Sequence, residues 1–234
     1  MERTALVTGG SSGIGLEIAR MLAGEGYGVT IAGRSEERLV RASESVAGDV
    51  CPVVADLAQA EGAVSLTRAH AERFGRLDVL VNNAGIALSG TVDLTTTDEL
   101  DAQLATNVRG PFLVTREALD LLRAAGAEHG KALIVNIASV AGKHGQPRSA
   151  AYSATKAALI SLTEAVQRQT AGEGIQATAL CPGLVATPMT EGARVPAEEM
   201  VTPADVAEAV RFLLNLSRWC LVPEIVLNRR GAVA

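Results

Sequence analysis

The sequence is short of cysteine and lysine, and it has neither a basic block nor a long apolar run. Its three cysteines lie far apart without a C-x-x-C pair, which is typical of small core residues in a reducing compartment. Net charge is −5 without a basic cluster, so we expect no nucleic-acid partner. No apolar stretch approaches the ~20 residues that span a bilayer, and no signal peptide is expected because a strand-like run begins at Thr4. The sequence therefore predicts a cytoplasmic protein that contacts no membrane. No group of His, Cys or Asp has metal-ligand spacing, so no metal is expected.

Short apolar runs alternate with helical patterns along the 234 residues. Such alternation predicts a parallel α/β sheet covered by helices on both faces, and the length fits one domain, residues 1–234. Ligands of such sheets bind in the crevice beyond the carboxyl ends of the strands. Helices are expected over about residues 98–122, 151–170 and 204–216. The runs predicted as strands are Thr4–Thr8, Tyr27–Ala32, Val50–Ala55, Asp78–Val81, Lys131–Ala138, Ile175–Cys181 and Val222–Leu227.

A glycine-rich turn, TGGSSGIG at residues 8–15, follows the first predicted strand and leads into a helical pattern. Glycines let the backbone approach a pyrophosphate, and the helix N-terminus supplies N–H groups and the positive end of a dipole. Plain loops also contain such turns, but the position directly after the first strand favours dinucleotide binding. The predicted cofactor contacts in this turn are Gly9, Ser11, Ser12, Gly13, Ile14 and Gly15.

The ends of the second and third predicted strands indicate which cofactor is bound. A carboxylate after the second strand would bind the ribose 2′-hydroxyl of NAD, whereas an arginine accommodates the 2′-phosphate of NADP. The chain has Arg34 there, which favours NADP(H) over NAD(H), although Arg34 alternatively begins a solvated helix beside Glu36 and Glu37. Asp56 ends the third strand, where it can accept a hydrogen bond from the adenine amino group or cap the next helix, and the two uses are compatible. Leu57 beside it is assigned to the same site.

Further polar residues follow the fourth and fifth predicted strands. In the segment NNAG at residues 82–85, amides would satisfy loop backbone and the glycine would leave room for a ribose. Ser139 follows the fifth strand, and the next helix begins with Tyr152-x-x-x-Lys156. One turn apart on a helix face, the Lys156 ammonium is expected to lower the pKa of the Tyr152 phenol from its usual ~10. The alternative is an ordinary helix with a surface lysine; against it, the chain has only three lysines and two tyrosines.

Together these motifs resemble the short-chain dehydrogenase/reductase family in its compact one-domain branch. The resemblance extends over essentially the whole chain, and it implies a Rossmann-type, doubly wound parallel sheet of about seven strands in the order 3-2-1-4-5-6-7. The larger epimerase-like branch fits less well, because its turn needs a glycine where Ser12 stands. The motifs that carry the resemblance are the glycine turn at 8–15, Asn82–Gly85, Asn107, Ser139, Tyr152-x-x-x-Lys156 and Pro182-Gly183.

The resemblance also implies roles for individual residues. Tyr152 would be the general acid in carbonyl reduction and the general base in alcohol oxidation, and Ser139 would polarise the substrate oxygen. Lys156 would lower the pKa of Tyr152 and hold the nicotinamide ribose. Asn107 would place a water in a proton relay behind Lys156, or alternatively bond locally within its helix. Residues 188–201 would close over the substrate. Cofactor contacts are further expected from Asn83, Ala84, Gly85, Pro182, Gly183, Val185 and Thr187, the last of which is alternatively an N-cap before Pro188.

The expected function is that of an NADP(H)-dependent oxidoreductase that interconverts a ketone and a secondary alcohol, as a homodimer or homotetramer. A specific alternative is a 3-oxoacyl-[acyl-carrier-protein] reductase with an acyl thioester substrate. Its acidic carrier protein would need a basic surface, for which Arg109, Arg148 and Arg168 are candidates. A non-catalytic NADP(H)-binding sensor is the alternative of another class, but such proteins characteristically lose the tyrosine or the lysine.

The chain departs from the family's pattern in two places. Residues 228–231 read Asn-Arg-Arg-Gly where Asp-Gly-Gly is common, which puts the usual C-terminal packing in doubt. Gln169 stands where many relatives have a glutamate that forms an ion pair between subunits. Lys143 and His144, in the loop after Ser139, are expected to be solvated rather than to select an anionic substrate.

Overall fold

Seven strands form one parallel sheet at the centre of the protein. The computed structural model describes residues 3–232, and its strands lie in the order β3-β2-β1-β4-β5-β6-β7. Every neighbouring pair is parallel, which confirms the predicted Rossmann-type arrangement. The strands are β1 (Thr4–Thr8), β2 (Gly28–Gly33), β3 (Val50–Val54), β4 (Val79–Asn82), β5 (Ala132–Ile137), β6 (Ile175–Pro182) and β7 (Glu224–Leu227).

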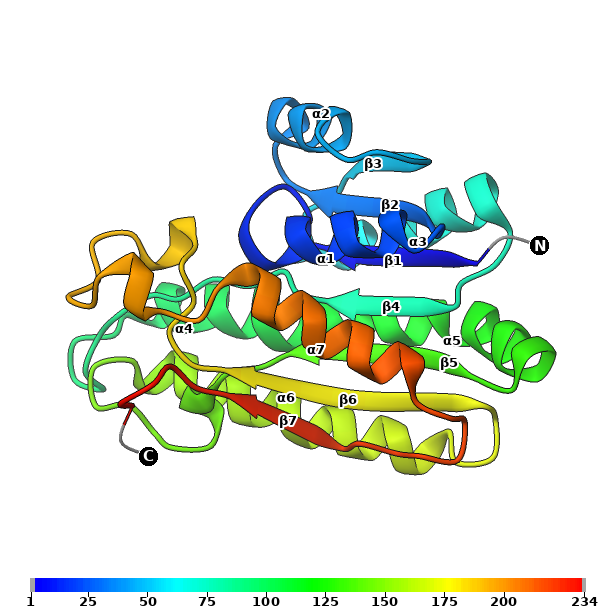
Figure 1. The fold of residues 1–234 in the computed structure, drawn as a ribbon. Helices are drawn as coiled ribbons and strands as arrows, with labels where there is room; N and C mark the ends of the chain where they lie inside the picture. The colour runs from blue at the N-terminus through cyan, green and yellow to red at the C-terminus, as the bar shows by residue number, and fades with distance from the viewer. Residues whose placement is uncertain (1–2, 233–234) are drawn as a thin grey trace.

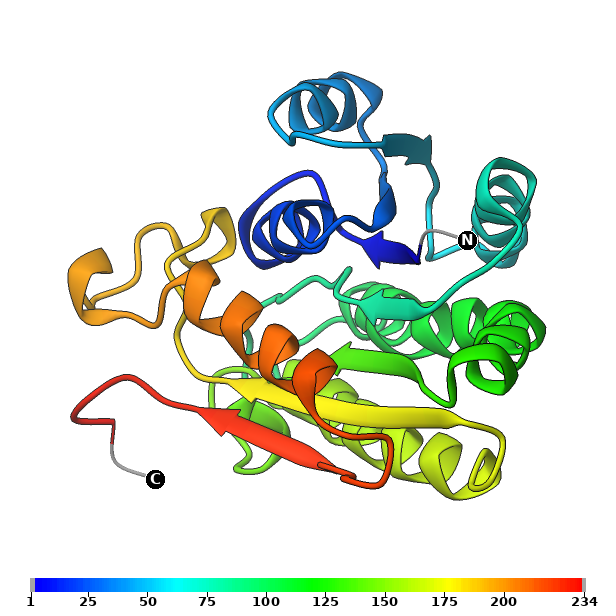
Figure 2. The same ribbon diagram turned by 45° about the vertical axis from the view of Figure 1, so that its right-hand side comes forward.

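Helices cover both faces of the sheet, as the two views of the ribbon show (Figure 1, Figure 2). One face carries α1 (Gly13–Gly24), α2 (Glu36–Glu44) and α7 (Pro203–Asn215). The other carries α3 (Ala60–Phe74), α4 (Thr97–Leu104), α5 (Gly110–His129) and α6 (Ala150–Gln169). Among residues 3–232, no helix has both the length and the apolarity to cross a membrane.

Alternate residues of each strand pack against the two helical layers. In β1, Ala5 and Val7 belong to the core beneath α1 and α7, whereas Leu6 belongs to the core beneath α3 and α5. All five residues of β1 are buried, as are all six of β5. This double burial explains why the strands read as continuous apolar runs rather than as alternating patterns.

The helix predicted over residues 98–122 is three consecutive pieces and ends later than expected. After α4, a π-helical turn at Ala105–Arg109 precedes α5, and α5 ends before Gly130, whose φ is 71°. Apolar periodicity does not mark a local change from i→i+4 to i→i+5 hydrogen bonding, so the sequence did not indicate the π turn. The turn contains Asn107, one of the predicted site residues.

Several predicted motifs meet at the carboxyl edge of the sheet. The glycine turn follows β1, Asn83 follows β4, Ser139 follows β5 and Gly183 follows β6. Beyond β6, two short 3-10 turns, Pro188–Thr190 and Ala197–Glu199, precede α7. In Figure 1 this orange segment lies beside the same edge, in the place expected of a segment that closes over a ligand.

Candidate active site

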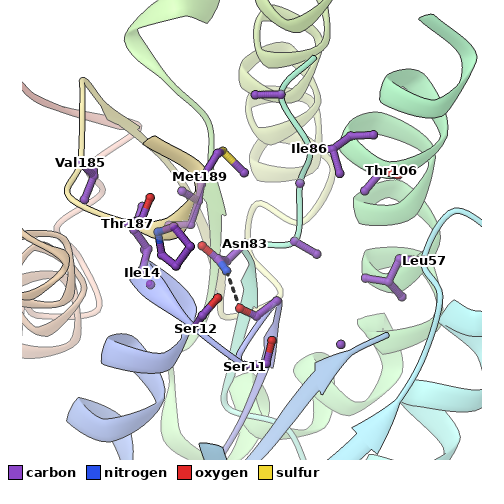
Figure 3. Close-up of a pocket in the computed structure, with 18 of the residues that line it drawn as sticks. Ser11, Ser12, Ile14, Leu57, Asn83, Ile86, Thr106, Val185, Thr187 and Met189 are labelled. Atoms are coloured by element: carbon purple, nitrogen blue, oxygen red, sulfur yellow. Dashed lines mark hydrogen bonds between the residues drawn. The ribbon is translucent and has the colours of Figure 1, made fainter. Parts of the chain in front are cut away.

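A cavity of about 730 Å³ lies along the carboxyl edge of the sheet (Figure 3). It extends from the turn between β1 and α1 to the start of α6 and the segment after β6. Of the predicted site residues, Gly15 and Asn107 do not line it. Those that do are Gly9, Ser11, Ser12, Gly13, Ile14, Arg34, Asp56, Leu57, Asn83, Ala84, Gly85, Ser139, Tyr152, Lys156, Pro182, Gly183, Val185 and Thr187.

The start of α1 is arranged for an anion. Ser12 precedes the helix in an extended conformation, and its side chain makes no capping hydrogen bond. Gly13 and Ile14, the first residues of the helix, line the cavity. The N–H groups of a first helical turn have no partner within the helix, and the helix dipole adds positive potential there. Because no side chain caps this end, the turn can bind a phosphate group.

Close contact between two strand ends explains the glycines of this turn. Asn83 donates from Nδ2 to the carbonyl oxygens of Thr8 (3.0 Å) and Gly9 (3.1 Å), and the second of these lies beneath Gly15. A Cβ on Gly15 would lie 2.4 Å from both Asn83 Nδ2 and the Gly9 oxygen. Thr8 Oγ1 in turn accepts from the N–H groups of Asn83 (2.9 Å) and Ala84 (3.0 Å). Gly15 therefore supports the cradle from behind rather than lining it.

Basic residues gather where β2 ends. Arg34 and Arg38 both line the cavity, and Arg38 donates from Nη2 to Ser12 Oγ at 3.0 Å. Asp56 lies across from them after β3, and its Oδ1 accepts from the N–H of Ala58 at 3.1 Å. The expectation that Asp56 caps the next helix is wrong because α3 begins after Gln59.

At the other end of the cavity, Ser139, Tyr152 and Lys156 line one wall. Ser139 follows β5, and its Oγ accepts from the N–H of Ala141 at 3.1 Å. Tyr152 and Lys156 project from the first two turns of α6. Lys156 is buried, its Nζ donates to the carbonyl of Ile137 at 2.7 Å, and the same Nζ lies 5.6 Å from the Tyr152 ring centroid. A hydroxyl, a phenol and an ammonium therefore share one small region.

Burial controls the titration of both α6 groups. It lowers the pKa of Lys156 from 10.5 to about 8, so the amine is still mostly protonated at neutral pH. Burial also raises the pKa of Tyr152, while the neighbouring Ser139 hydroxyl acts in the opposite direction. The expected lowering of the Tyr152 pKa is therefore not found, because desolvation of the phenolate outweighs the opposing interactions. Tyr152 is a protonated hydrogen-bond donor at neutral pH.

Replacing Lys156 by methionine should change how stability depends on pH. Between pH 8 and 10.5 the unfolded chain binds a proton that folded Lys156 has released, so folding becomes more favourable as pH rises through this window. Relative to Lys156→Met, the free energy of unfolding of the unaltered protein should rise by about 2–3 kcal/mol between about pH 7 and pH 10. Urea denaturation across this range measures it, and a constant difference would show that Lys156 is not desolvated.

Asn107 fixes the loop after β4 from within the π-helical turn. It is fully buried, its Oδ1 accepts from the N–H of Ile86, and its Nδ2 donates to the carbonyl of the same residue, both at 2.8 Å. Nδ2 also reaches Thr155 Oγ1 on α6 at 3.1 Å. These partners are 21 and 48 residues away, so the alternative of local bonding within its own helix is wrong. A water relay through Asn107 stays a prediction.

The turn after β6 packs against the start of α1. A Cβ on Gly13 would lie 3.1 Å from Thr187 Cγ2, which places the two segments in contact. Thr187 is the N-cap of the 3-10 turn that begins at Pro188, as the N-cap alternative expected, and its N–H donates to Thr190 Oγ1 at 3.1 Å. Thr187 lines the cavity near Ile14 (Figure 3), where its hydroxyl can bind a ligand.

Several contributing residues were not predicted as site residues. Thr8 holds the loop after β4, Thr155 holds Asn107, and Arg38 lines the cavity together with Arg34. Thr8 begins the glycine motif, so its position was a usable signal. Thr155 and Arg38 act through contacts with partners 48 and 26 residues away, which local sequence does not reveal.

The cavity fits a nicotinamide dinucleotide. The end lined by β1 and β2 has the uncapped start of α1 and the two arginines, Arg34 and Arg38. It also has Gly9, whose φ is 65° and where a Cβ would lie 2.9 Å from Ala84 Cα. Ser139, Tyr152 and Lys156 occupy the end lined by β5 and α6. Phosphates would bind at the first end, and the nicotinamide ribose at the second.

Comparisons with known proteins agree with this geometry. Residues 3–197 match the family described as short chain dehydrogenase. The 2-(R)-hydroxypropyl-CoM dehydrogenase of Xanthobacter autotrophicus is 40% identical in an alignment of 234 positions that covers 91% of each chain. An alcohol dehydrogenase from Thermococcus sibiricus, complexed with 5-hydroxy-NADP, superposes with a TM-score of 0.90 at 28% identity, covering 99% of this chain and 98% of its own. A 3-ketoacyl-(acyl-carrier-protein) reductase from Brucella melitensis, complexed with NADH, gives 0.91 at 28% identity, with coverages of 97% and 96%.

Sequence, fold and cavity thus point to the same kind of protein. The family match covers most of the chain, and the similar structures each hold a nicotinamide cofactor. The chain therefore belongs to the short chain dehydrogenase family and is an NAD(P)-dependent oxidoreductase.

Proposed function

We propose that this protein reduces a ketone, or oxidises the corresponding secondary alcohol, with NADP(H) as cofactor and Tyr152 as the general acid and base. The observation that supports this most directly is that Ser139, Tyr152 and Lys156 line one cavity together with the glycine turn and two arginines. When bound, the cofactor supplies or accepts the hydride. The protein's own residues position the substrate oxygen and move its proton.

Each of the three residues has a role that follows from its surroundings. Tyr152 is protonated at neutral pH, since the usual pKa of a phenol, ~10, is well above 7 and burial raises it further. It can therefore donate a proton to a carbonyl oxygen. Ser139 would hold that oxygen by a second hydrogen bond, which stabilises the negative charge that develops on it. Lys156 keeps a positive charge close to the phenol, with its pKa near 8. That charge stabilises the phenolate that remains after proton transfer.

The NADP(H) preference is proposed from Arg34 and Arg38. Both line the cavity where β2 ends and α2 begins, and neither takes part in an ion pair within residues 3–232. Guanidinium groups bind phosphates by charge-assisted hydrogen bonds, each worth about 1.5–3 kcal/mol. A 2′-phosphate at this end would therefore bind more tightly than a free ribose hydroxyl.

Removing both arginines should weaken NADPH binding selectively. We expect the Arg34→Ala, Arg38→Ala double variant to raise the Kd for NADPH by about 10- to 100-fold while the Kd for NADH stays nearly unchanged, as measured by fluorescence titration. Arg41→Ala is the matched control, because Arg41 lies on α2 as Arg38 does, pairs with Glu37 and does not line the cavity. Equal losses for the two cofactors would contradict the assignment.

The test of the activity itself is NADPH oxidation with a panel of simple and cyclic ketones and with an acetoacetyl thioester. Turnover of ketones would support the proposal. Turnover confined to the thioester would favour the alternative of a 3-oxoacyl-[acyl-carrier-protein] reductase, the activity named for the structurally similar Brucella melitensis protein. Two of the three basic residues considered for a carrier protein are engaged within the chain. Arg109 donates to the carbonyl of Ala58, and Arg168 pairs with Glu164. NADPH binding without any turnover would favour the sensor alternative.

We also propose that the protein forms a dimer or tetramer through the helices around residues 100–122 and 151–170. Leu100 and Leu104 on α4 and Phe112 on α5 are exposed apolar residues in that region. A second copy covering them would remove this apolar surface from water. The mass in solution, measured by light scattering, would refute the proposal if it matched one chain.

A further inference from the structure

Charge is distributed unevenly along the cavity. Within the described residues, four of its lining residues carry a charge: Arg34, Arg38, Asp56 and Lys156. The first three follow β2 and β3, at the end assigned to the adenosine part of the cofactor. Lys156 is buried and bonded to the Ile137 carbonyl. The part of the cavity next to Ser139 and Tyr152 therefore offers no further charged group to a substrate.

Most of the residues that line this part are apolar, with Thr106 beside Ile86 as a polar exception (Figure 3). Ile86, Ala87 and Leu88 follow β4, and Pro188 and Met189 follow β6. Figure 3 shows Ile86 and Met189 at the opposite end from Ser11 and Ser12. Leu88 is 37% exposed and Met189 55% exposed. Large apolar side chains left open to a cavity are what an apolar ligand would cover.

Hydrogen bonds within the protein hold the loop after β4 in place, and they also satisfy the Thr190 hydroxyl, so that it is not free to bind a substrate. Asn107 bonds both backbone groups of Ile86, and the buried Gln103 accepts from the N–H of Leu88 at 3.2 Å. Thr190 lines the cavity, but its hydroxyl donates to the Val185 carbonyl at 2.6 Å and accepts from the N–H of Thr187. The loop after β4 is thus fixed before a substrate arrives, with its apolar side chains facing the cavity.

Of the cations on the loop after Ser139, Lys143 is paired within the protein, and Arg148 does not line the cavity. Lys143 Nζ lies 2.6 Å from Glu224 Oε1 on β7, so its charge is neutralised within the protein. The sequence predicted a solvated Lys143, and its side chain is exposed while also pairing with Glu224. The ammonium of Lys156 is bonded to the Ile137 carbonyl, and no second cation of the described chain lines this part of the cavity. An anionic substituent that entered beside Ser139 would leave water without a free cation to pair with, and burying an unpaired charge is costly.

We propose that the carbonyl substrate carries uncharged, apolar substituents, and that Leu88 and Met189 select for them. This inference rests on the proposed ketone reductase activity and names its substrate class. One wall of the substrate end comes from the fixed loop after β4, and the other comes from the segment after β6.

The test compares methyl acetoacetate with acetoacetate, which share a β-ketone and differ in charge. With NADPH, we expect kcat/KM for the ester to exceed that for the carboxylate by at least about tenfold. Equal efficiency, or preference for the carboxylate, would overturn this inference while leaving the ketone reductase activity intact. Absence of turnover with these two and with every other ketone in the panel would overturn both.

Arginine substitutions then test the two named residues. Leu88→Arg and Met189→Arg should each lower the ester-to-carboxylate ratio of kcat/KM at least about fivefold, because each supplies the missing cation. Both positions are partly exposed, so the variants should fold, and the second remains informative if the first does not. Val92→Arg is the control, since Val92 is 80% exposed and does not line the cavity. A ratio unchanged in both variants, or changed equally by Val92→Arg, would overturn the assignment.

Discussion

Tyr152→Phe should lower kcat/KM for ketone reduction by about 10³-fold and leave the Kd for NADPH nearly unchanged. Proton donation by a positioned side chain contributes about 10²- to 10⁴-fold, and Tyr152, which lines the cavity beside Ser139, is the proposed general acid. The substitution removes one oxygen and keeps the aromatic ring in its place. Steady-state NADPH oxidation gives the rate, and fluorescence titration gives the affinity.

The other tyrosine of the chain provides the control. Tyr27 is also buried, but it lies just before β2, at the amino edge of the sheet, where its hydroxyl is 3.5 Å from Arg3 Nη1. Tyr27→Phe should leave turnover unchanged, which separates loss of the catalytic hydroxyl from the general effect of removing a buried phenol. A Tyr152→Phe variant that keeps more than about a tenth of the activity would eliminate Tyr152 as the general acid.

The titration of Tyr152 shows what a local sequence pattern can and cannot predict. The spacing of Tyr152 and Lys156 predicted that they lie close together, and the 5.6 Å between Nζ and the ring centroid agrees. It also predicted a lowered phenol pKa, and that was wrong because α6 is pressed against the ends of β5 and β6, where both groups lose water. The amount of burial depends on segments far away in the chain, so it cannot be predicted from the spacing of two residues on a helix.

The strand ends were predictable for a related reason. The run from Thr4 to Thr8 is apolar on both faces and is stopped by glycines, so the position of the site at its carboxyl end followed from the pattern. The π turn did not follow, because Asn107 sits in a segment whose apolar spacing looks helical throughout. Its partners, Ile86 and Thr155, become neighbours only when the sheet forms.

Charged side chains were the least predictable part of the site. Lys143 is exposed as expected, but its ion pair with Glu224 was not predicted, because Glu224 is 81 residues further along the chain and lies on the neighbouring edge strand. Arg38 was not predicted as a site residue, and it reaches Ser12 across the start of α1. Long side chains have several rotamers, and their partners are set by tertiary contacts, so sequence spacing fixes neither.

Gly15→Ala should reduce kcat/KM for NADPH on the order of 100-fold, since misplacing a binding group by about 1 Å has effects of that size. The added Cβ would lie 2.4 Å from the Gly9 oxygen, which is backbone and cannot rotate away. The turn must therefore move away from Asn83, whose Nδ2 ties it to the end of β4. The same overpacking should lower the free energy of unfolding by about 1–3 kcal/mol.

Gly24→Ala separates this close contact from the general effect of replacing a helical glycine. Gly24 ends the same helix, and a Cβ there would meet nothing within 4 Å. Alanine has the higher helix propensity, so this variant should be as stable as the unaltered protein or more stable by up to about 1 kcal/mol, with unchanged NADPH kinetics. If Gly15→Ala bound NADPH as well as Gly24→Ala, the contact between the β1 and β4 turns would not shape the cofactor site, and the cradle would have to be assigned to other residues.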